Sequence, residues 1–170
     1  MSTTNAWRQG ISNATADGYA NLEHMRALEG YAEVRDVVRR FDDDRGRRYC
    51  DIFPLVTGDI NITHAYPGVT TAWHAHNRQF DEWFVIKGAL KVGLAIRNPD
   101  GTFKWKFVSL SEYDGKVLRI LPGVLHGWRN HTNQEAVLMY HISEKYDPDN
   151  PDEIRYSIEQ VGADWSTPVK

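Results

Sequence analysis

Between residues 34 and 142 the sequence is a succession of short strand-like segments separated by turn residues. Val, Ile, Thr, Phe, Tyr and Trp are frequent in the segments, and turns such as Asn98-Pro99-Asp100-Gly101 separate them. About nine segments at this regular spacing predict an all-β sandwich or barrel. The expected strands are 34–38, 47–53, 59–66, the two arms of 68–88, 89–97, 102–110, 116–121, 125–129 and 136–142, with a charged turn at 41–46.

The two ends of the chain differ from this pattern. Apolar residues recur every third position from Thr15 to Leu28, and Gly30 follows as a stop signal. This predicts one amphipathic helix in an N-terminal extension of residues 1–33. The C-terminal tail is rich in proline and acidic residues, and we expect it to be irregular, either wrapping the surface or making one helical turn around Asp152–Tyr156. We therefore expect a single folded domain at residues 34–170.

Charge and cysteine content limit the classes of protein to which this chain can belong. The net charge is −3, and the arginines between residues 39 and 48 are interleaved with aspartates, so we do not expect nucleic-acid binding. A single cysteine, Cys50, rules out an intramolecular disulfide and is typical of a reducing compartment. No segment has the pattern of a signal peptide or the length of a transmembrane span. We therefore expect a soluble, cytoplasmic protein without a membrane partner.

Histidines and a carboxylate gather around one strand–turn–strand segment. In a strand, His74 and His76 point to the same face, because side chains alternate between faces. Asp81 begins the next apolar segment, and His126 lies in a later hairpin-like segment. Glu82 would face the other way on a regular strand. Three imidazoles and one carboxylate suit a divalent metal ion, so we predict a metal site at His74, His76, Asp81 and His126.

His64 is a fourth histidine that could face inward. Alternation puts it on one strand face with Ile60 and Ile62. We interpret it as a hydrogen-bonded histidine of the core or its rim, not as a ligand.

The spacing of glycines and histidines resembles that of the cupin superfamily, whose members are double-stranded β-helices, or jelly rolls. The first cupin motif places a His-x-His pair and a carboxylate between two glycines. The second places two glycines before a histidine and an asparagine. Both motifs are present in this order, as Gly68, His74, His76, Asp81 and Gly88, then Gly115, Gly123, His126 and Asn130. The resemblance implies a cupin jelly roll, with the N-terminal helix and the irregular tail added to it.

A narrower resemblance, over about residues 34–165, is to the dTDP-4-dehydrorhamnose 3,5-epimerase family. It rests on Asp44-Arg45-Gly46, Trp73-His74, Leu110-Ser111, Pro122–Trp128, Tyr146-Asp147-Pro148, Asp152–Arg155 and Asp164-Trp165. Enzymes of that family epimerise nucleotide-linked 4-keto-6-deoxysugars, usually as dimers, without nicotinamide or flavin. The resemblance implies a homodimeric epimerase or isomerase whose small-molecule substrate is a nucleotide-sugar.

The same resemblance implies roles for individual residues. His74 matches the histidine that abstracts the proton beside the keto group. Tyr140 matches the tyrosine that donates a proton on the opposite face, and His126 matches a second active-site histidine. Arg45, near the nucleotide phosphates in that family, and Trp128 are candidates for substrate binding.

The chain departs from that family where the pocket would be cationic. Thr71 replaces an arginine, Asp81 replaces a lysine, and His76 stands where a glutamine is common. The C-terminal aspartate that orients the base histidine comes from a segment that this chain is expected to lack. A divalent ion such as Fe, Zn, Ni or Mn could supply the lost positive charge, but His74 cannot then be both a ligand and a free base.

Two other hypotheses therefore stay open beside the epimerase. One is a metal-dependent cupin enzyme of another class, such as a dioxygenase. The other is a non-catalytic cupin that binds a small ligand.

Overall fold

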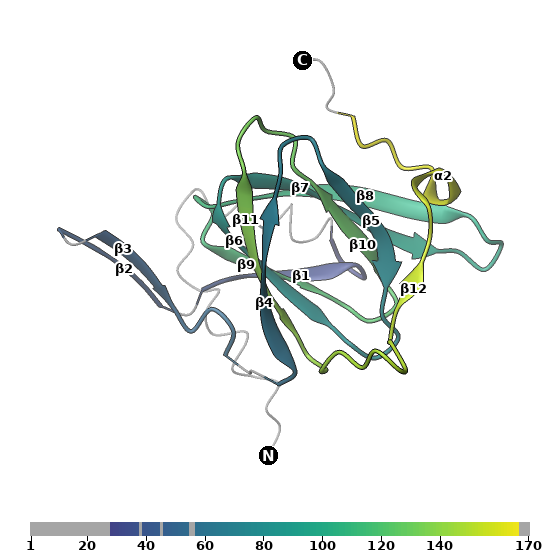
Figure 1. Cartoon of the computed structure of the whole chain (residues 1–170), viewed down its shortest axis with the longest axis horizontal. Coiled ribbons are helices and arrows are strands. Elements are labelled where there is room, and N and C mark those ends of the chain that lie inside the picture. Colours follow the sequence, from purple (N-terminus) through teal and green to yellow (C-terminus); the bar gives the residue numbers. More distant parts are fainter. Residues whose placement is uncertain (1–27, 38, 45, 55–56, 167–170) are drawn as a thin grey trace.

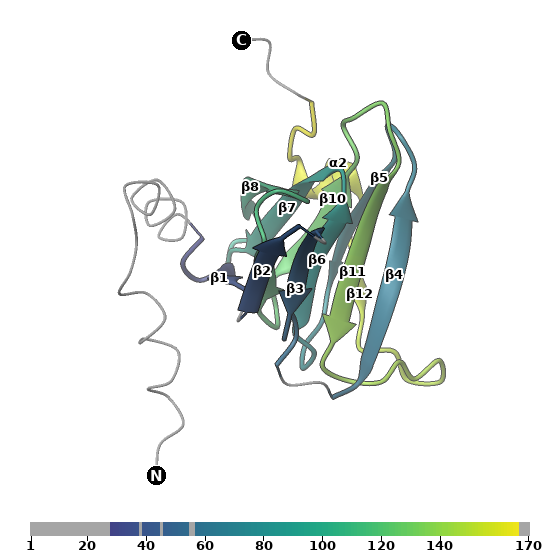
Figure 2. The same cartoon turned by 90° about the vertical axis from the view of Figure 1, so that its left-hand side faces the viewer.

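The computed structural model describes residues 28–37, 39–44, 46–54 and 57–166. Its strands are β1 (Ala32–Asp36), β2 (Arg39–Asp43), β3 (Gly46–Cys50), β4 (Asp59–Ala65), β5 (Thr70–Ala75), β6 (Asp81–Lys87), β7 (Ala89–Arg97), β8 (Phe103–Ser111), β9 (Lys116–Ile120), β10 (Leu125–Arg129), β11 (Ala136–Ile142) and β12 (Ile154–Arg155). The first sheet has the order β1-β9-β6-β11-β4, the second has β12-β5-β10-β7-β8, and β2 and β3 form a separate hairpin. The two sheets pack face to face, and the hairpin projects from them (Figure 1, Figure 2). The predicted all-β jelly roll is confirmed.

Strands that are far apart in the sequence are neighbours in both sheets. β6 lies between β9 and β11, and β5 lies between β12 and β10. The register of β5 sets His74 opposite His126 on one side and opposite Arg155 on the other. Residues opposite each other in an antiparallel pair share a face, so three strands bring these side chains to one side of the second sheet.

The main core fills the space between the sheets. Leu90, Val92 and Leu94 on β7 are fully buried in it. Each side chain of this size contributes about 1.5–3 kcal/mol when it is fully buried. Leu28 belongs to the same core and lies in a turn, and the rest of the helix predicted over Thr15–Leu28 lies outside the described residues.

The C-terminal segment covers the outer face of the second sheet. Trp73 and Trp165 are almost fully buried there, with ring centroids 5.0 Å apart. A Cβ atom at Gly93 would lie 2.7 Å from the Trp165 ring, so only glycine leaves room for it. The tail is therefore packed on the sandwich.

The structure of the tail differs from the helical turn predicted at residues 152–156. Strand β12 forms there instead, because the free edge of β5 offers backbone partners. Helix α2 (Ile158–Val161) begins after Ser157, whose side chain makes a capping box with Gln160. No helix in the described part of the chain is long and apolar enough to cross a membrane.

Two boundaries near the hairpin also differ from the prediction. β2 continues through residues 41–43, which the sequence pattern places in a charged turn, and β3 ends at Cys50 rather than at Phe53. Asp43 pairs with Gly46, so residues 41–43 belong to the strands of the hairpin and not to its turn. Asp51 has a positive φ of 54°, a conformation incompatible with a strand, and this ends β3.

Candidate active site

The four predicted metal ligands come together between the two sheets. His74 lies on β5, His76 directly follows this strand, His126 lies on β10 and Asp81 begins β6. One ligand atom from each residue lies within 4.8 Å of those of the other three. The histidines come from the second sheet and the carboxylate from the first. The side chains therefore form one cluster that spans the sandwich.

His126 is held in one tautomer by its own main chain. Its side chain is 2% exposed, and Nδ1 lies 2.9 Å from the carbonyl oxygen of Val124. A carbonyl only accepts, so Nδ1 donates its proton, and Nε2 faces Asp81 Oδ2 at 3.5 Å. Nε2 is buried and has no hydrogen-bond partner among the described residues. A proton donor or a metal ion would satisfy it.

The C-terminal tail holds His76 in the same way. Nδ1 of His76 donates to the carbonyl oxygen of Asp152, and Nε2 faces Asp81 Oδ1 at 4.0 Å. The Asp152 carboxylate also accepts the three backbone N–H groups of residues 77–79, at 2.9 to 3.1 Å. Burial works to raise the pKa of Asp152, but these N–H groups outweigh it and hold the pKa below its usual value.

Sequence reasoning missed Asp152. A main-chain carbonyl, which every residue type has, makes the contact with His76, so no residue pattern points to it. The carboxylate contacts depend on where the tail lies, and the sequence alone does not give that position.

Asp81 is a buried carboxylate with two side-chain donors. Gln79 Nε2 lies 2.7 Å from Oδ1, and Trp83 Nε1 lies 3.2 Å from Oδ2. Burial works to raise the pKa of Asp81, but His126 and Gln79 outweigh it and hold the pKa well below its usual range. Asp81 is therefore ionised at neutral pH and gives the cluster a negative charge.

His74 differs from the other two histidines. Its ring packs edge-on against that of His126, with centroids 4.2 Å apart, and its side chain makes no hydrogen bond within the described residues. Burial first, and then the charges of His126 and His76, lower the pKa of His74 from 6.5 to about 2. The ring is therefore neutral at physiological pH.

Tyr140 faces the same interior from the opposite sheet. It lies on β11 opposite Trp83 of β6, and both residues pack in the main core. The Trp83 ring lies 5.4 Å from that of His126, so the tyrosine and the histidines belong to one connected group. The Tyr140 hydroxyl makes no hydrogen bond within the described residues. Trp128, half-buried on β10, packs against the same core.

Two further residues named from the sequence, Arg45 and His64, differ in what the structure shows of them. Arg45 lies outside the described residues. His64 has the expected hydrogen bond, with Nδ1 3.0 Å from Glu135 Oε1, but the inward orientation considered for it is wrong. Its side chain is 60% exposed, because the face that it shares with Ile60 and Ile62 on β4 is the outer one.

Glu82 faces away from the cluster, as alternation predicts. Its buried carboxylate lies 3.1 Å from Arg35, 3.0 Å from Arg119 and 3.0 Å from His141. Burial works to raise the pKa of Glu82, but these partners outweigh it and lower the pKa. The network lies on the outer face of the first sheet and fixes the start of β6, next to Asp81.

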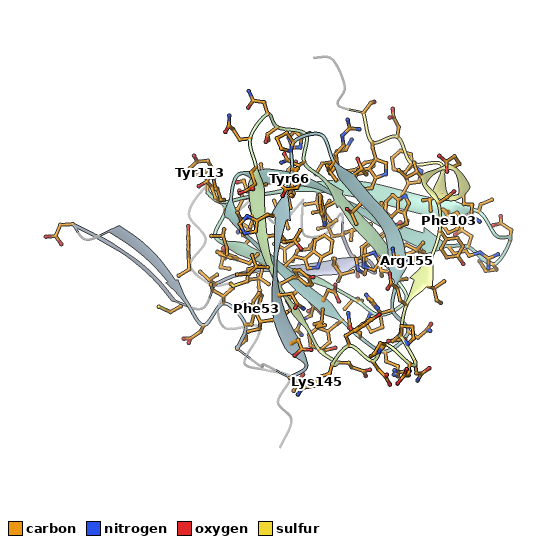
Figure 3. The ribbon with its side chains drawn as sticks, in the orientation of Figure 1. Phe53, Tyr66, Phe103, Tyr113, Lys145 and Arg155 are labelled. Carbon is orange, nitrogen blue, oxygen red and sulfur yellow. The ribbon has the colours of Figure 1, made fainter. Side chains whose placement is uncertain are left out.

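A hollow that is open to solvent lies beside His76. Gln79, Asp152 and Glu153 line it, as does Lys145, which lies at the lower edge of the molecule in Figure 3. The hollow lies at the end of the sandwich where β5 stops and β6 starts, and His76 is the cluster residue that lines it.

The sequence is similar to those of known proteins. The model of the polysaccharide biosynthesis C-terminal domain family matches residues 41–154. The spore coat polysaccharide biosynthesis protein SpsL of Bacillus subtilis (strain 168) is 33% identical over 114 residues, which are 65% of this chain and 76% of that protein. The probable low-salt glycan biosynthesis epimerase Agl13 of Haloferax volcanii is 28% identical over 109 residues, which are 61% of this chain and 70% of that protein.

A solved structure shares the fold. The dTDP-4-dehydrorhamnose 3,5-epimerase of Elizabethkingia anophelis NUHP1 superposes with a TM-score of 0.63 at 18% identity, over 81% of this chain and 82% of that one. This likeness confirms the fold that the resemblance to that family implies. The matched region 41–154 contains all four residues of the cluster. The chain therefore belongs to the polysaccharide biosynthesis C-terminal domain family and has the cupin fold of the dTDP-4-dehydrorhamnose 3,5-epimerases.

Proposed function

We propose that this chain is a sugar-nucleotide epimerase or isomerase. It would remove and return a proton on the carbon next to the carbonyl of a nucleotide-linked keto-deoxysugar. The observation that carries the proposal is a neutral His74 on one sheet together with Tyr140 on the inner face of the other. The names of similar proteins support it, since one relative is a probable glycan biosynthesis epimerase and one protein of the same fold is a dTDP-sugar epimerase.

His74 is suited to act as the base. A neutral imidazole has a lone pair for the proton, and a positioned base contributes about 10²–10⁴-fold to the rate. The burial that keeps the ring neutral also makes it a weak base. The carbonyl oxygen of the substrate therefore needs stabilisation as negative charge develops on it.

Tyr140 is suited to return the proton. Epimerisation needs an acid on the face opposite to the base, and a phenol, with a usual pKa of about 10, can donate to an enolate carbon. The Tyr140 hydroxyl is not engaged elsewhere among the described residues. Trp128 is suited to line the space for the sugar.

The cluster fits a divalent metal ion. His76 and His126 each have Nδ1 bonded to a carbonyl oxygen and Nε2 turned inward, and ionised Asp81 lies 4.0 and 3.5 Å from these Nε2 atoms. Two histidines and a carboxylate suit Fe, Zn, Ni or Mn. His76, Asp81 and His126 would hold the ion, which would supply positive charge at the carbonyl oxygen.

This division of roles avoids the competition for His74. His76 and His126 have the main-chain hydrogen bond that usually orients a metal-ligating histidine, and His74 has no such bond within the described residues. His74 is therefore assigned to proton abstraction, although its ring lies close enough to be a fourth ligand.

The protein is further proposed to be a cytoplasmic homodimer. Ile60 and Ile62 are 48% and 58% exposed on the edge strand β4, and Ile86 is 44% exposed on β6 of the same sheet. Apolar side chains on one sheet face are suited to burial against a second copy of the chain. The free thiol of Cys50 supports a reducing compartment.

Solvent deuterium exchange tests the proposed reaction. In heavy water, the wild type should incorporate deuterium into a 4-keto-6-deoxysugar nucleotide, because the C–H bond next to the carbonyl must break. His74→Ala should abolish incorporation but retain the metal, whereas His76→Ala should lose the metal. His64→Ala removes an exposed histidine of the outer face and should behave as the wild type.

Two outcomes would change the assignment. If His74→Ala loses the metal as His76→Ala does, His74 is a ligand, and a metal-dependent enzyme such as a dioxygenase becomes the favoured hypothesis. If the wild type exchanges no proton with any keto-sugar nucleotide, the fold carries another function, such as binding of a small ligand.

A further inference from the structure

Strand β12 places Arg155 beside His74 at the free edge of the second sheet. Arg155 lies opposite His74, and Ile154 lies opposite Ala75. Two further backbone hydrogen bonds, of 3.2 and 3.0 Å, join Trp73 to the residue after the strand and extend the pairing. Opposite residues in an antiparallel pair share a face, with Cβ atoms about 4.5–5.5 Å apart. Arg155 therefore lies on the inner face with His74.

The three residues Arg155, His74 and His126 form a row from solvent to the interior. His126 is 2% exposed, and the side chain of Arg155 is 75% exposed. Figure 3 labels Arg155 between the β5 and β12 ribbons. After burial and the neighbouring histidines, Arg155 is one of the charges that lower the pKa of His74, which agrees with this proximity. The guanidinium therefore stands at the rim of the site.

The hollow beside His76 has the opposite electrostatic character. Four carboxylates line it, together with only two cationic side chains, Arg78 and Lys145. Arg78 is already paired with Glu144 at 3.2 Å. A dianion in the hollow would meet net negative charge, whereas at the rim it would meet Arg155, which is paired with one carboxylate, that of Glu153.

We propose that Arg155 binds the diphosphate of the nucleotide-sugar at the rim, with the sugar ring directed inward to His74. The inference rests on the proposed function and names the residue that recognises the anionic part of the substrate. The carbon that bears the phosphate is separated by a single ring atom from either possible reacting carbon. A diphosphate at Arg155 and a reacting carbon at the neighbouring His74 are therefore compatible with the size of one hexose ring.

Glu153 aims the guanidinium. Its Oε1 lies 2.6 Å from Arg155 Nη2, and its side chain is 21% exposed. An ion pair with one exposed partner contributes little, so exchanging the carboxylate for phosphate oxygens costs little free energy. Arginine is suited to this exchange, because its planar group makes two parallel hydrogen bonds to phosphate.

Calorimetric titration with thymidine 5′-diphosphate and uridine 5′-diphosphate, and with the two nucleosides, tests the inference on the full chain. Arg155→Gln should weaken binding of both diphosphates by about 10-fold or more and leave nucleoside binding unchanged. Arg155→Lys should lie between Arg155→Gln and the wild type, because lysine keeps the charge but not the paired geometry. Glu153→Gln should bind the diphosphates as tightly as the wild type or more tightly.

Arg78→Gln is the matched control, because it removes an arginine from the hollow rather than from the rim. A loss of diphosphate binding in Arg78→Gln but not in Arg155→Gln would overturn the inference and put the phosphates in the hollow. Equal binding by Arg155→Gln and the wild type would overturn it and leave the proposed function intact. A wild type that binds no nucleoside diphosphate and shows no solvent exchange would overturn both. In turnover, KM should rise in Arg155→Gln with kcat retained, and a fall in kcat alone would contradict a phosphate-binding role.

Discussion

His126 and Asp81 meet across the gap between the two sheets, with Nε2 of the histidine 3.5 Å from Oδ2 of the carboxylate. The histidine belongs to β10 of the second sheet and the aspartate to β6 of the first. An ion held by both residues would therefore join the two halves of the sandwich. The thermal stability of the protein can therefore be used to detect metal binding without any assay of activity.

Metal removal should lower the melting temperature. An ion that binds only the folded chain stabilises it by about 2.7 kcal/mol at a free concentration 100 times its Kd. Calorimetric scans should show Tm falling after dialysis against a chelator and recovering when zinc is returned. Asp81→Asn should show no such response. A wild-type Tm that is indifferent to chelator and to added metal would count against the ion.

Asp152→Ala should weaken the metal site although Asp152 is not a ligand. The change leaves the three N–H groups of residues 77–79 without their acceptor and loosens the loop between His76 and Asp81. Losing such a supporting residue commonly costs about 10–100-fold in metal affinity. Competition with a chelator measures this affinity. Asp149→Ala, an exposed change in the connection between β11 and β12 that also contains Asp152, is the control. Equal metal affinities of Asp152→Ala and the wild type would show that the Asp152 main chain alone is sufficient.

Tyr140→Phe should separate the two halves of the reaction. Proton abstraction by His74 should continue, so deuterium should still enter the substrate. Delivery of the proton on the other face should fail, so the epimerised product should fall by about 10²–10⁴-fold. Proton NMR of the sugar measures both quantities. Tyr66→Phe, at an exposed tyrosine, should resemble the wild type, and loss of exchange in Tyr140→Phe would make the tyrosine part of the abstraction step.

Glu82→Gln should destabilise the fold without removing a cluster residue. The change leaves Arg35 and Arg119 without their buried counter-charge, and breaking a buried pair in this way costs about 3–5 kcal/mol. Urea denaturation measures the change, with Glu159→Gln on the exposed first turn of α2 as the control. The folded pKa of Glu82 lies below its ordinary value of 4.5, so its stabilisation is complete above that pH and is lost as the pH falls through the folded pKa. The difference in unfolding free energy between the wild type and Glu82→Gln should therefore become smaller in acid.

Ile62→Asp should dissociate the proposed dimer. The side chain is 58% exposed on the outer face of β4, and a carboxylate there would be buried without a partner in the interface. Light scattering should show twice the chain mass of 19.5 kDa for the wild type and a single chain for the variant. Tyr113→Asp, a change in the turn between β8 and β9, should stay dimeric. A wild type of single-chain mass at micromolar concentration would refute the dimer.

The regular strands could be predicted because their limits are local. β7, β10 and β11 have the predicted bounds, since turn residues bracket each one and its apolar residues fit a strand. β12 could not be predicted in this way. Two residues carry no periodicity, and the strand exists only because the edge of β5 is beside it.

The site divides in the same manner. His74, His76 and His126 could be placed on one face from alternation and motif spacing, and Asp81 followed from its position at the start of the next strand. The outward orientation of His64 could not be predicted, because alternation gives which residues share a face but not which face is inward.

His76 and the residue that fixes its tautomer, Asp152, are separated by 76 positions. During translation, β4 to β11 and all four cluster residues leave the ribosome before Asp152 and Arg155 do. A nascent chain that stops after β11 would carry the histidines but not the tail that orients them. The proposed site is therefore complete only after the segment that contains Asp152 has been synthesised, well after the last of the four cluster residues.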